Sequence, residues 1–549
     1  MTRKTYSTNI NMKKKRTSMP KGLLGALIMT AVIAVIIDYL SLPAYNIHSI
    51  ETLFLFAGYF GLFAFLSVFW TGKLTKAAFA AVSVSGIIVA FVVVMSILGS
   101  EILNAGAFRN QINIVESGNF SEDFDLVQYD KVPNVDYATA KQLGDKQMGK
   151  IQGLGSQYNI NIDYTLISID DKIVRVAPLE YQDFFKWLSN KGDGIPGYIE
   201  VNVRDASDVS LVTLTDGIIY SPSAFFDQDL LRHVRFTYRT DILDDFSFEI
   251  DDAGHPYFVI SVIEPKVGFF SGWDASGVIV VDAVTGTMNK YGLDAIPSWV
   301  DRVQPVSLAW YQVDNWGYYV NGWFNTVFGR KDVIQTTSGY NYLSINGQTY
   351  VFSGMTSAGA DQSIVGFSLI NLKTKDAFFY RVGGADETSA MSSAQGAVQH
   401  LGYIATFPVL LNVEGEPSYF MSLKDQEGLV KMYALVSVTD YSVVGTGTTL
   451  AETKANYLKK LVEAGLVDST GDLEKTVTLP VSKIVSAIID GNTQYYITLE
   501  GDARLFKVSL NLSPETVLTQ VGDIVTITYT ESTAKTIDAT AFDNTSYDY

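Results

Sequence analysis

The chain has 549 residues and no cysteine, so disulfides and thiolate chemistry are excluded. It has only four histidines, and none of them has the paired spacing of a zinc site. No Gly-rich phosphate loop and no Gly-x-Ser-x-Gly nucleophile elbow occurs in it. We therefore expect no catalytic residues, no metal site and no cofactor. The histidines, for which we expect structural or surface roles, are His48, His233, His255 and His400.

Basic residues are scarce beyond the first hundred positions. The chain carries 40 Lys and Arg against 58 Asp and Glu, a formal net charge of −18. Nine basic and two acidic residues before Ser100 give that part a charge of +7, which leaves −25 for the rest. A surface this acidic repels nucleic acid and holds anionic lipid headgroups poorly. It suits a soluble domain in an ionic exterior, or cationic partners.

Long apolar runs are absent after residue 100, but three occur before it, over residues 22–39, 52–70 and 77–98. Each is close to the ~20 residues that cross a bilayer core. A cleaved signal peptide is an alternative for the first run, but two more follow and no small-residue cleavage site is evident. We therefore predict a multi-pass membrane protein with three transmembrane helices over residues 22–99.

The basic residues also predict the orientation. Seven precede the first run and two separate the second from the third, whereas the loop between the first two holds only His48 and Glu51. Lys and Arg favour the cytoplasmic side. We expect a cytoplasmic basic N-terminus over residues 1–21 and an extracytoplasmic region beyond residue 100, at the plasma membrane. The nine residues are Arg3, Lys4, Lys13, Lys14, Lys15, Arg16, Lys21, Lys73 and Lys76.

The outer region is too long for a single core. Its strand-rich patterns predict an α+β, antiparallel-sheet-rich fold, and turns about every ten residues near its end favour a small β-barrel of the OB kind. The expected parts are a helical stalk and connector over 100–159, α+β domains over 160–300 and 301–467, the barrel over 475–533 and a polar tail over 534–549.

Two segments of the outer region share one plan. Residues 248–258 and 409–420 each read as a strand, a Gly-x-Pro turn and another strand, with Gly254 matching Gly415 and Pro256 matching Pro417. A strand-rich module present twice would account for much of the length. A common hairpin that recurs by chance is the alternative.

The first copy leads into residues 257–291, which contain Val280-Val-Asp-Ala-Val-Thr-Gly286. This stretch resembles the PepSY type of module, a small α/β fold with a helix against an antiparallel sheet, found in exported bacterial proteins. Residues 132–457 as a whole resemble a group of large, uncharacterised membrane-anchored proteins of Gram-positive bacteria. The resemblance implies location and architecture, and it assigns no reaction.

Aromatic residues concentrate between positions 310 and 324. If exposed, these rings could stack on the sugars of a cell wall or form a subunit contact. If buried, they form the core of a β-rich domain or an interface between domains. The residues that we single out as possible ligand or subunit contacts are Trp310, Tyr311, Trp316, Tyr318, Tyr319 and Trp323.

Adjacent aspartates occur at positions 170–171, 244–245 and 251–252. Glycosidases use two carboxylates across a cleft, but neighbouring pairs in turns rarely do so. The third pair lacks the ladder of a calcium loop. We therefore interpret all three pairs as turn residues.

These observations favour a non-enzymatic, membrane-anchored cell-envelope protein whose extracytoplasmic domains form an oligomeric scaffold or a binding surface. One alternative is a cell-wall glycan-binding or peptidoglycan-processing protein, and another is an accessory subunit of a transport or secretion complex. The expected partners are the membrane itself, further copies of this chain, and cell-wall glycan or another envelope protein.

Overall fold

The computed structural model describes residues 21–117, 120, 135–150, 153–169, 172–345, 348–359, 363–467, 474–489, 492–530 and 536–547. The chain divides into two compact units. The membrane unit consists of Met1–Leu98 with Arg235–Asp241, and the large unit of Gly99–Val234 with Ile242–Tyr549. The predicted basic N-terminus lies outside the described residues, apart from Lys21.

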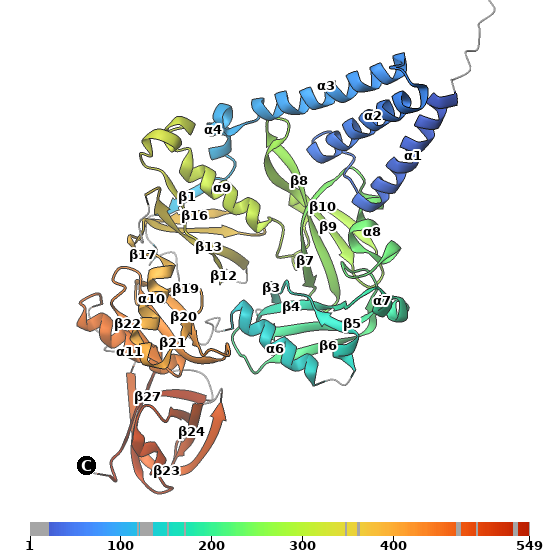
Figure 1. The fold of residues 1–549 in the computed structure, drawn as a ribbon. Coiled ribbons are helices and arrows are strands. Elements are labelled where there is room, and N and C mark those ends of the chain that lie inside the picture. Colours follow the sequence, from blue (N-terminus) through green and yellow to red (C-terminus); the bar gives the residue numbers. More distant parts are fainter. Residues whose placement is uncertain are drawn as a thin grey trace, which may run out of the picture. The chain divides into compact units, whose positions relative to one another are not determined.

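The membrane unit contains the three predicted apolar helices, α1 (Lys21–Ser41), α2 (Ile50–Thr71) and α3 (Lys76–Leu98) (Figure 1). Each is long and apolar enough to cross a membrane. Small residues lie where the helices pack, and the Ser85 hydroxyl donates to the Ala57 carbonyl at 2.9 Å. Such small residues allow the close helix approach that stabilises membrane bundles. The buried ones are Ala26, Ala57, Ala64, Ala78 and Ala81.

The segment predicted as a stalk is part of the large unit's folded structure. Helix α4 (Glu101–Arg109) packs through Phe108 into a small core with Val267 and Tyr319. Strand β1 (Ile114–Ser117) then pairs in parallel with β16 (Ala377–Tyr380). Within the stalk and connector predicted over 100–159, residues 114–117 are therefore a strand, because β1 completes a sheet whose other strands come more than 200 residues later in the chain.

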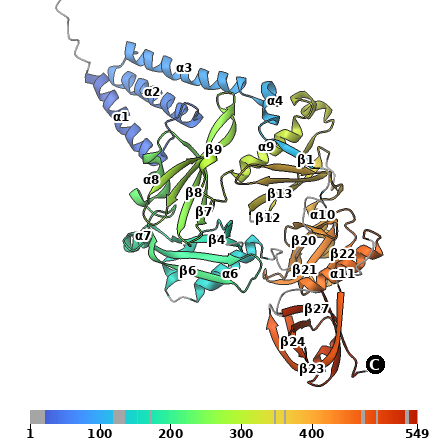
Figure 2. The ribbon, with the colours of Figure 1, turned by 180° about the vertical axis from the view of Figure 1, so that it is seen from behind.

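The expected α+β domain over residues 160–300 contains two separate sheets. Figures 1 and 2 show them as distinct blocks. The first has the path β2-β4-β5-β6, with β3 on β4, and the second is a meander in the order β10-β9-β8-β7. Their elements are α6 (Tyr137–Gly149), β2 (Tyr158–Ile160), β3 (Thr165–Ile169), β4 (Lys172–Tyr181), α7 (Phe184–Asn190), β5 (Ile195–Asn202), β6 (Val209–Ile218), α8 (Leu230–Thr237), β7 (Ile242–Ile250), β8 (Pro256–Val267), β9 (Ser271–Asp282) and β10 (Met288–Gly292).

Two further sheets follow, with helices packed on them. One runs β1-β16-β15-β13-β11, with β12 on β13; the other runs β18-β20-β21-β22, with β19 on β20. A separate two-stranded sheet pairs β14 (Ser363–Ile364) with β17 (Gly384–Ala385). The other elements of this part are α9 (Val306–Tyr318), β11 (Ile334–Thr336), β12 (Asn341–Ile345), β13 (Gln348–Ser357), β15 (Gly366–Asn371), β16 (Ala377–Tyr380), α10 (Glu387–Ala397), β18 (Ile404–Ala405), β19 (Val409–Val413), β20 (Glu416–Lys424), β21 (Val430–Ser437), β22 (Val444–Gly447) and α11 (Leu450–Glu463).

The two segments predicted to share one plan are both hairpins in the structure. Strands β7 and β8 pair around Gly254, and β19 and β20 pair around Gly415. Both glycines have a positive φ, +79° and +88°, a backbone conformation that disfavours residues with a Cβ. In each case a third antiparallel strand, β9 or β21, pairs with the second strand of the hairpin.

The C-terminal strands form a closed five-stranded barrel in the order β23-β24-β25-β27-β26, with β25 and β27 parallel. The long β23 pairs with β26 through its first half and with β24 through its second. The polar tail predicted from residue 534 is wrong at this point, because β27 closes the barrel. The strands are β23 (Glu474–Ile489), β24 (Asn492–Leu499), β25 (Leu505–Ser509), β26 (Ile524–Thr530) and β27 (Thr536–Asn544).

Candidate functional site

The predicted aromatic contact residues lie on and after α9, and most of them are buried or partly buried. Trp316 and Tyr319 belong to hydrophobic cores, and Trp310, Tyr318 and Trp323 pack against those cores. Tyr311 is the exposed member of the set. The hydroxyls of Tyr311 and Tyr319 both donate to the carboxylate of Glu101 and so hold α4 against α9. The structure thus brings these aromatics together as packing.

Two of the histidines and the first aspartate of the pair at positions 251–252 have structural partners. His255 lies 3.1 Å from the Asp282 carboxylate, and a ring nitrogen of His233 lies 2.8 Å from the Gly286 carbonyl oxygen. Asp251 accepts the backbone N–H groups of Ala253 and His255, as a turn aspartate does. In the part of the chain that the structure describes, no group of three acidic or histidine side chains is placed to hold a metal. The pair at positions 170–171 lies outside that part.

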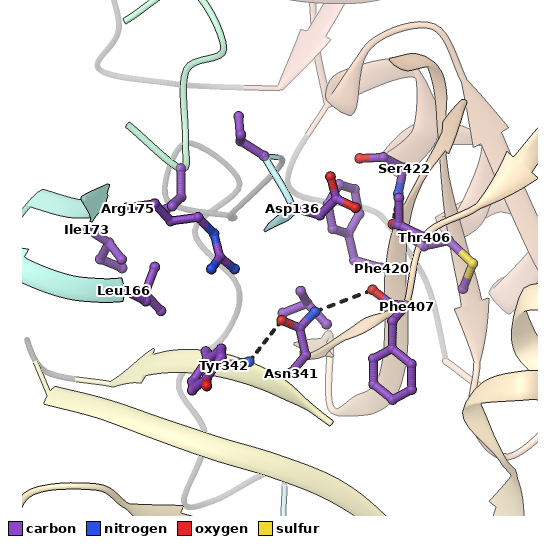
Figure 3. A pocket seen from close by; sticks show the side chains of 14 residues that line it. Asp136, Leu166, Ile173, Arg175, Asn341, Tyr342, Thr406, Phe407, Phe420 and Ser422 are labelled. Atoms are coloured by element: carbon purple, nitrogen blue, oxygen red, sulfur yellow. Dashed lines mark hydrogen bonds between the residues drawn. The ribbon is translucent and has the colours of Figure 1, made fainter. Parts of the chain in front are cut away.

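A polar cleft of about 530 Å³ opens in the large unit where α6, β3, β4, β7 and β12 approach one another. It falls within the 300–1,000 Å³ range of typical ligand sites. A much smaller cavity adjoins it and shares Asp136, Arg175, Asn341, Tyr342 and Phe407 (Figure 3). The cleft is lined by Asp136, Tyr137, Asp163, Tyr164, Thr165, Arg175, Asp245, Phe246, Ser247, Arg302, Tyr340, Asn341, Tyr342 and Phe407.

Two arginines in this lining keep donors without partners. Arg175, on β4, is 6% exposed, and its Nε–H has no hydrogen-bond partner among the described residues. Its guanidinium extends into the space between Leu166 and Asp136 (Figure 3). Arg302 holds its guanidinium 5.0 Å above the Tyr342 ring centroid, and in the part of the chain that the structure describes its Nε and Nη1 have no hydrogen-bond partner. A buried donor without an acceptor costs roughly 1–3 kcal/mol, so the site favours a ligand that supplies acceptor oxygens.

The carboxylates that line the cleft do not remove its preference for a ligand with acceptor oxygens. Asp136 caps α6 by accepting the Thr139 N–H at 2.9 Å, and it forms a 2.6 Å ion pair with Lys424. Although burial opposes ionisation, Lys424 and the Thr139 hydrogen bonds lower the pKa of Asp136. The negative charge of Asp136 is therefore balanced by the positive charge of Lys424. Burial raises the pKa of Asp245, and the charge of Arg302 opposes that shift.

Asp245 occupies a strained position in the cleft wall. Its φ is +42°, and the register of β7 against β8 shifts between Asp244 and Phe246. Such bulges redirect side chains and are frequent beside functional sites. The turn interpretation of the pair at positions 244–245 is therefore wrong, because both residues lie inside β7.

Buried carboxylates support the segment that carries Arg302. Glu249 is fully buried and accepts the N–H groups of Asp301 at 2.8 Å and Arg302 at 3.2 Å. Asp301 in turn accepts the Ser168 N–H at 2.7 Å, which ties this segment to β3. Burial, reinforced by the charge of Asp301, raises the pKa of Glu249 to about 8. Burial also raises the pKa of Asp301 to about 6.

Aromatic side chains form much of the remaining wall. Tyr137 and Tyr164 meet edge to face with centroids 6.3 Å apart, and so do Tyr340 and Tyr342 at 5.8 Å. Asn341 donates to the carbonyl oxygens of Phe407 and Pro408, which holds β12 to the segment just before β19. Exposed ring faces beside charged donors suit ligands that have both apolar faces and acceptor oxygens.

No family model matches the chain. No curated protein matches it. Among solved structures, the chain is similar at 11% identity to an endo-1,4-beta-xylanase from Bacteroides thetaiotaomicron VPI-5482, over 53% of this chain and 76% of that chain, with a TM-score of 0.17. A likeness at that TM-score carries no argument about the fold or activity of this chain.

Proposed function

We propose that the chain is a non-enzymatic, membrane-anchored binding protein whose large unit holds an acidic glycan in the polar cleft. The observation that carries this proposal is the pair Arg175 and Arg302, which line one cleft with donors that no group in the described part of the chain accepts. Arginine guanidinium groups pair with carboxylates and phosphates through parallel hydrogen bonds. The tyrosine-rich wall offers faces on which sugar rings stack.

The architecture expected from the sequence belongs to the same proposal. The N-terminus lies in the cytoplasm and the large unit faces the cell wall, as the distribution of Lys and Arg favours. The strand order of the barrel and its parallel β25–β27 pair support an OB-like fold. The two hairpin modules are PepSY-like, and association of like chains stays a prediction. The alternative functions are an oligomeric scaffold and an accessory subunit of a transport or secretion complex.

The topology has a direct test. Protease added to intact protoplasts that express the full chain, tagged after Tyr549, should remove the tag and the large unit while leaving the three spans. Protease added after lysis is the control that shows the protein to be cleavable. Full protection of the tag in intact protoplasts would overturn the orientation.

The cleft is tested by binding to the full-length protein in detergent micelles. Soluble peptidoglycan fragments and glycerol phosphate oligomers are titrated against the wild type and against Arg175→Gln and Arg302→Gln. Each substitution removes a charged hydrogen-bonding group, which contributes roughly 1.5–3 kcal/mol, so we expect affinity to fall about 10- to 100-fold.

Arg381→Gln is the matched control for these variants. Arg381 is 67% exposed, pairs with Glu116 and does not line the cleft, so its replacement should leave the affinity unchanged. Equal affinity of the wild type and both cleft variants for every probe, or no binding by the wild type, would refute the binding proposal.

A further inference from the structure

A short segment of the chain far from the spans in sequence belongs to the membrane unit. It is Arg235–Asp241, at the end of α8. The backbone N–H of Tyr45 donates to the Arg239 carbonyl at 2.8 Å, and the Asn46 side chain donates to the Thr240 carbonyl at 2.8 Å. These bonds fix the segment against the loop between α1 and α2. Its side chains are thereby placed at the end of a spanning helix.

A pocket of about 200 Å³ lies between this segment and α1. On α1 and the residue that follows it, the lining runs from Val35 to Leu42, about 10 Å along the helix axis at 1.5 Å per residue. The end toward the middle of the span is apolar and open, since Val35 is 68% exposed. Arg235 and Arg239 also line the pocket, and Arg239 lies beyond the end of α1, where its carbonyl accepts the Tyr45 N–H. The pocket therefore passes from the depth of lipid tails to that of headgroups.

The lining of this pocket contains two arginines and one carboxylate. Its carboxylate, Asp38, already accepts hydrogen bonds from the hydroxyls of Tyr45 and Tyr59, both at 2.6 Å. Among the residues that the structure describes, neither arginine forms an ion pair with a carboxylate.

The two guanidinium groups contact backbone carbonyls instead. Arg235 is 8% exposed; its Nη1 donates to the carbonyls of Tyr238 and Asp241, and its Nε has no partner within the described ranges. Burial lowers the pKa of Arg235, and the charge of Asp241 opposes that shift. Arg239 is exposed; its Nε donates to the Phe236 carbonyl at 3.4 Å, and its guanidinium lies 5.6 Å from the Phe236 ring centroid. Both guanidinium groups can therefore still donate hydrogen bonds to an anion.

We propose that this pocket binds the phosphate headgroup of an anionic membrane lipid, with an acyl chain along Val35 and Leu42. Arg235 and Arg239 pair with the phosphate, as guanidinium groups do in charge-assisted hydrogen bonds. Tyr39, Tyr45 and Phe236 lie around it in the manner of interfacial aromatic residues. The strongly acidic remainder of the chain would repel such lipids, so the site is a local exception. The proposal is independent of the function assigned to the cleft.

The test is lipid retention by the full-length protein, measured by native mass spectrometry in detergent. Dioleoylphosphatidylglycerol is the probe and dioleoylphosphatidylcholine the reference lipid. We expect preferential retention of phosphatidylglycerol by the wild type. A basic residue at a membrane surface contributes about a fivefold change in lipid affinity, so Arg239→Gln should weaken retention about fivefold and the double variant with Arg235→Gln about thirtyfold.

Two controls make the result decisive. Arg381→Gln removes one exposed guanidinium from the large unit and should retain lipid like the wild type. Arg239→Gln keeps the proposal testable if loss of Arg235 disturbs the end of α8. Glycerol 3-phosphate, which has the headgroup chemistry without acyl chains, should fail to displace the lipid. Equal retention by the wild type and Arg239→Gln, or displacement by equimolar glycerol phosphate, would overturn the proposal.

Discussion

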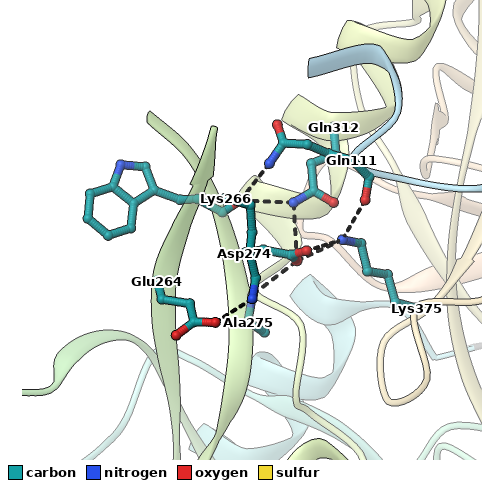
Figure 4. Close-up of polar contacts among 8 residues, drawn as sticks. Gln111, Glu264, Lys266, Asp274, Ala275, Gln312 and Lys375 are labelled. Atoms are coloured by element: carbon teal, nitrogen blue, oxygen red, sulfur yellow. Dashed lines mark hydrogen bonds and ion pairs between the residues drawn. The ribbon is translucent and has the colours of Figure 1, made fainter. Parts of the chain in front are cut away.

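Lys375→Met should lower the free energy of unfolding of the large unit by about 3 kcal/mol, because it leaves a mostly buried carboxylate without its cation. The Lys375 ammonium lies 2.7 Å from both carboxylate oxygens of Asp274, and each side chain is 17% exposed (Figure 4). Lys375 also donates to the Gln111 carbonyl, and Gln312 donates to Asp274. One ion pair thus joins the β15–β16 turn, β9, α9 and the segment before β1.

The matched control is Arg381→Met. Arg381 and Glu116 also join segments distant in sequence, at 2.8 Å, but their side chains are 67% and 48% exposed. Water screens such a pair, so the loss should stay below about 1 kcal/mol. Urea denaturation of the full-length protein in detergent, followed by tryptophan fluorescence, measures both variants. The double variant Asp274→Asn/Lys375→Met should lose less than the sum of the single variants. Equal midpoints for Lys375→Met and Arg381→Met would contradict this account.

The parts of the fold that could be predicted are those determined by local pattern. An apolar run as long as α3 commonly forms a spanning helix. This prediction does not depend on the residues that connect the run to its neighbours. Closely spaced turns likewise predicted a barrel. The closing strand β27 was missed because its alternation of buried Ile537, Ala539 and Phe542 with polar residues is short and lies in a polar stretch.

The cleft could not be predicted because its residues come from separate segments. Arg175 and Arg302 are 127 positions apart, and neither has a neighbour that marks it as functional. Only the topology brings β4 and the segment after Val300 to one space. The aromatic stretch drew attention because its residues are adjacent in the chain. In the structure that adjacency serves the packing of α9 and α4.

The second large effect is a rise in stability as the pH falls from 8.5 to 5.5. Burial raises the pKa of Glu249 to about 8 and that of Asp301 to about 6, well above the values of the unfolded chain. The folded protein therefore binds these protons more tightly. Their contribution is complete below the unfolded pKa, near 4, and is lost as the pH rises through about 6 for Asp301 and about 8 for Glu249. At about 1.4 kcal/mol per pKa unit, the change amounts to several kcal/mol.

Glu249→Gln separates this effect from other titrations, because an amide of nearly the same shape cannot lose a proton between pH 5.5 and 8.5. Its thermal unfolding midpoint should depend much less on pH than that of the wild type. Glu264→Gln is the control, since Glu264 is half exposed and pairs with Lys266 at the surface, and its pH dependence should match the wild type. Burial acts in the same direction on Asp245 and Glu387, which leaves a residual slope in every variant.

A wild-type midpoint that is flat or rises toward pH 8.5, or a slope that Glu249→Gln leaves intact, would show that Glu249 is ionised in the folded protein. Its contacts with the N–H groups of Asp301 and Arg302 would then stabilise a charge, and the segment that carries Arg302 would be tightest at high pH.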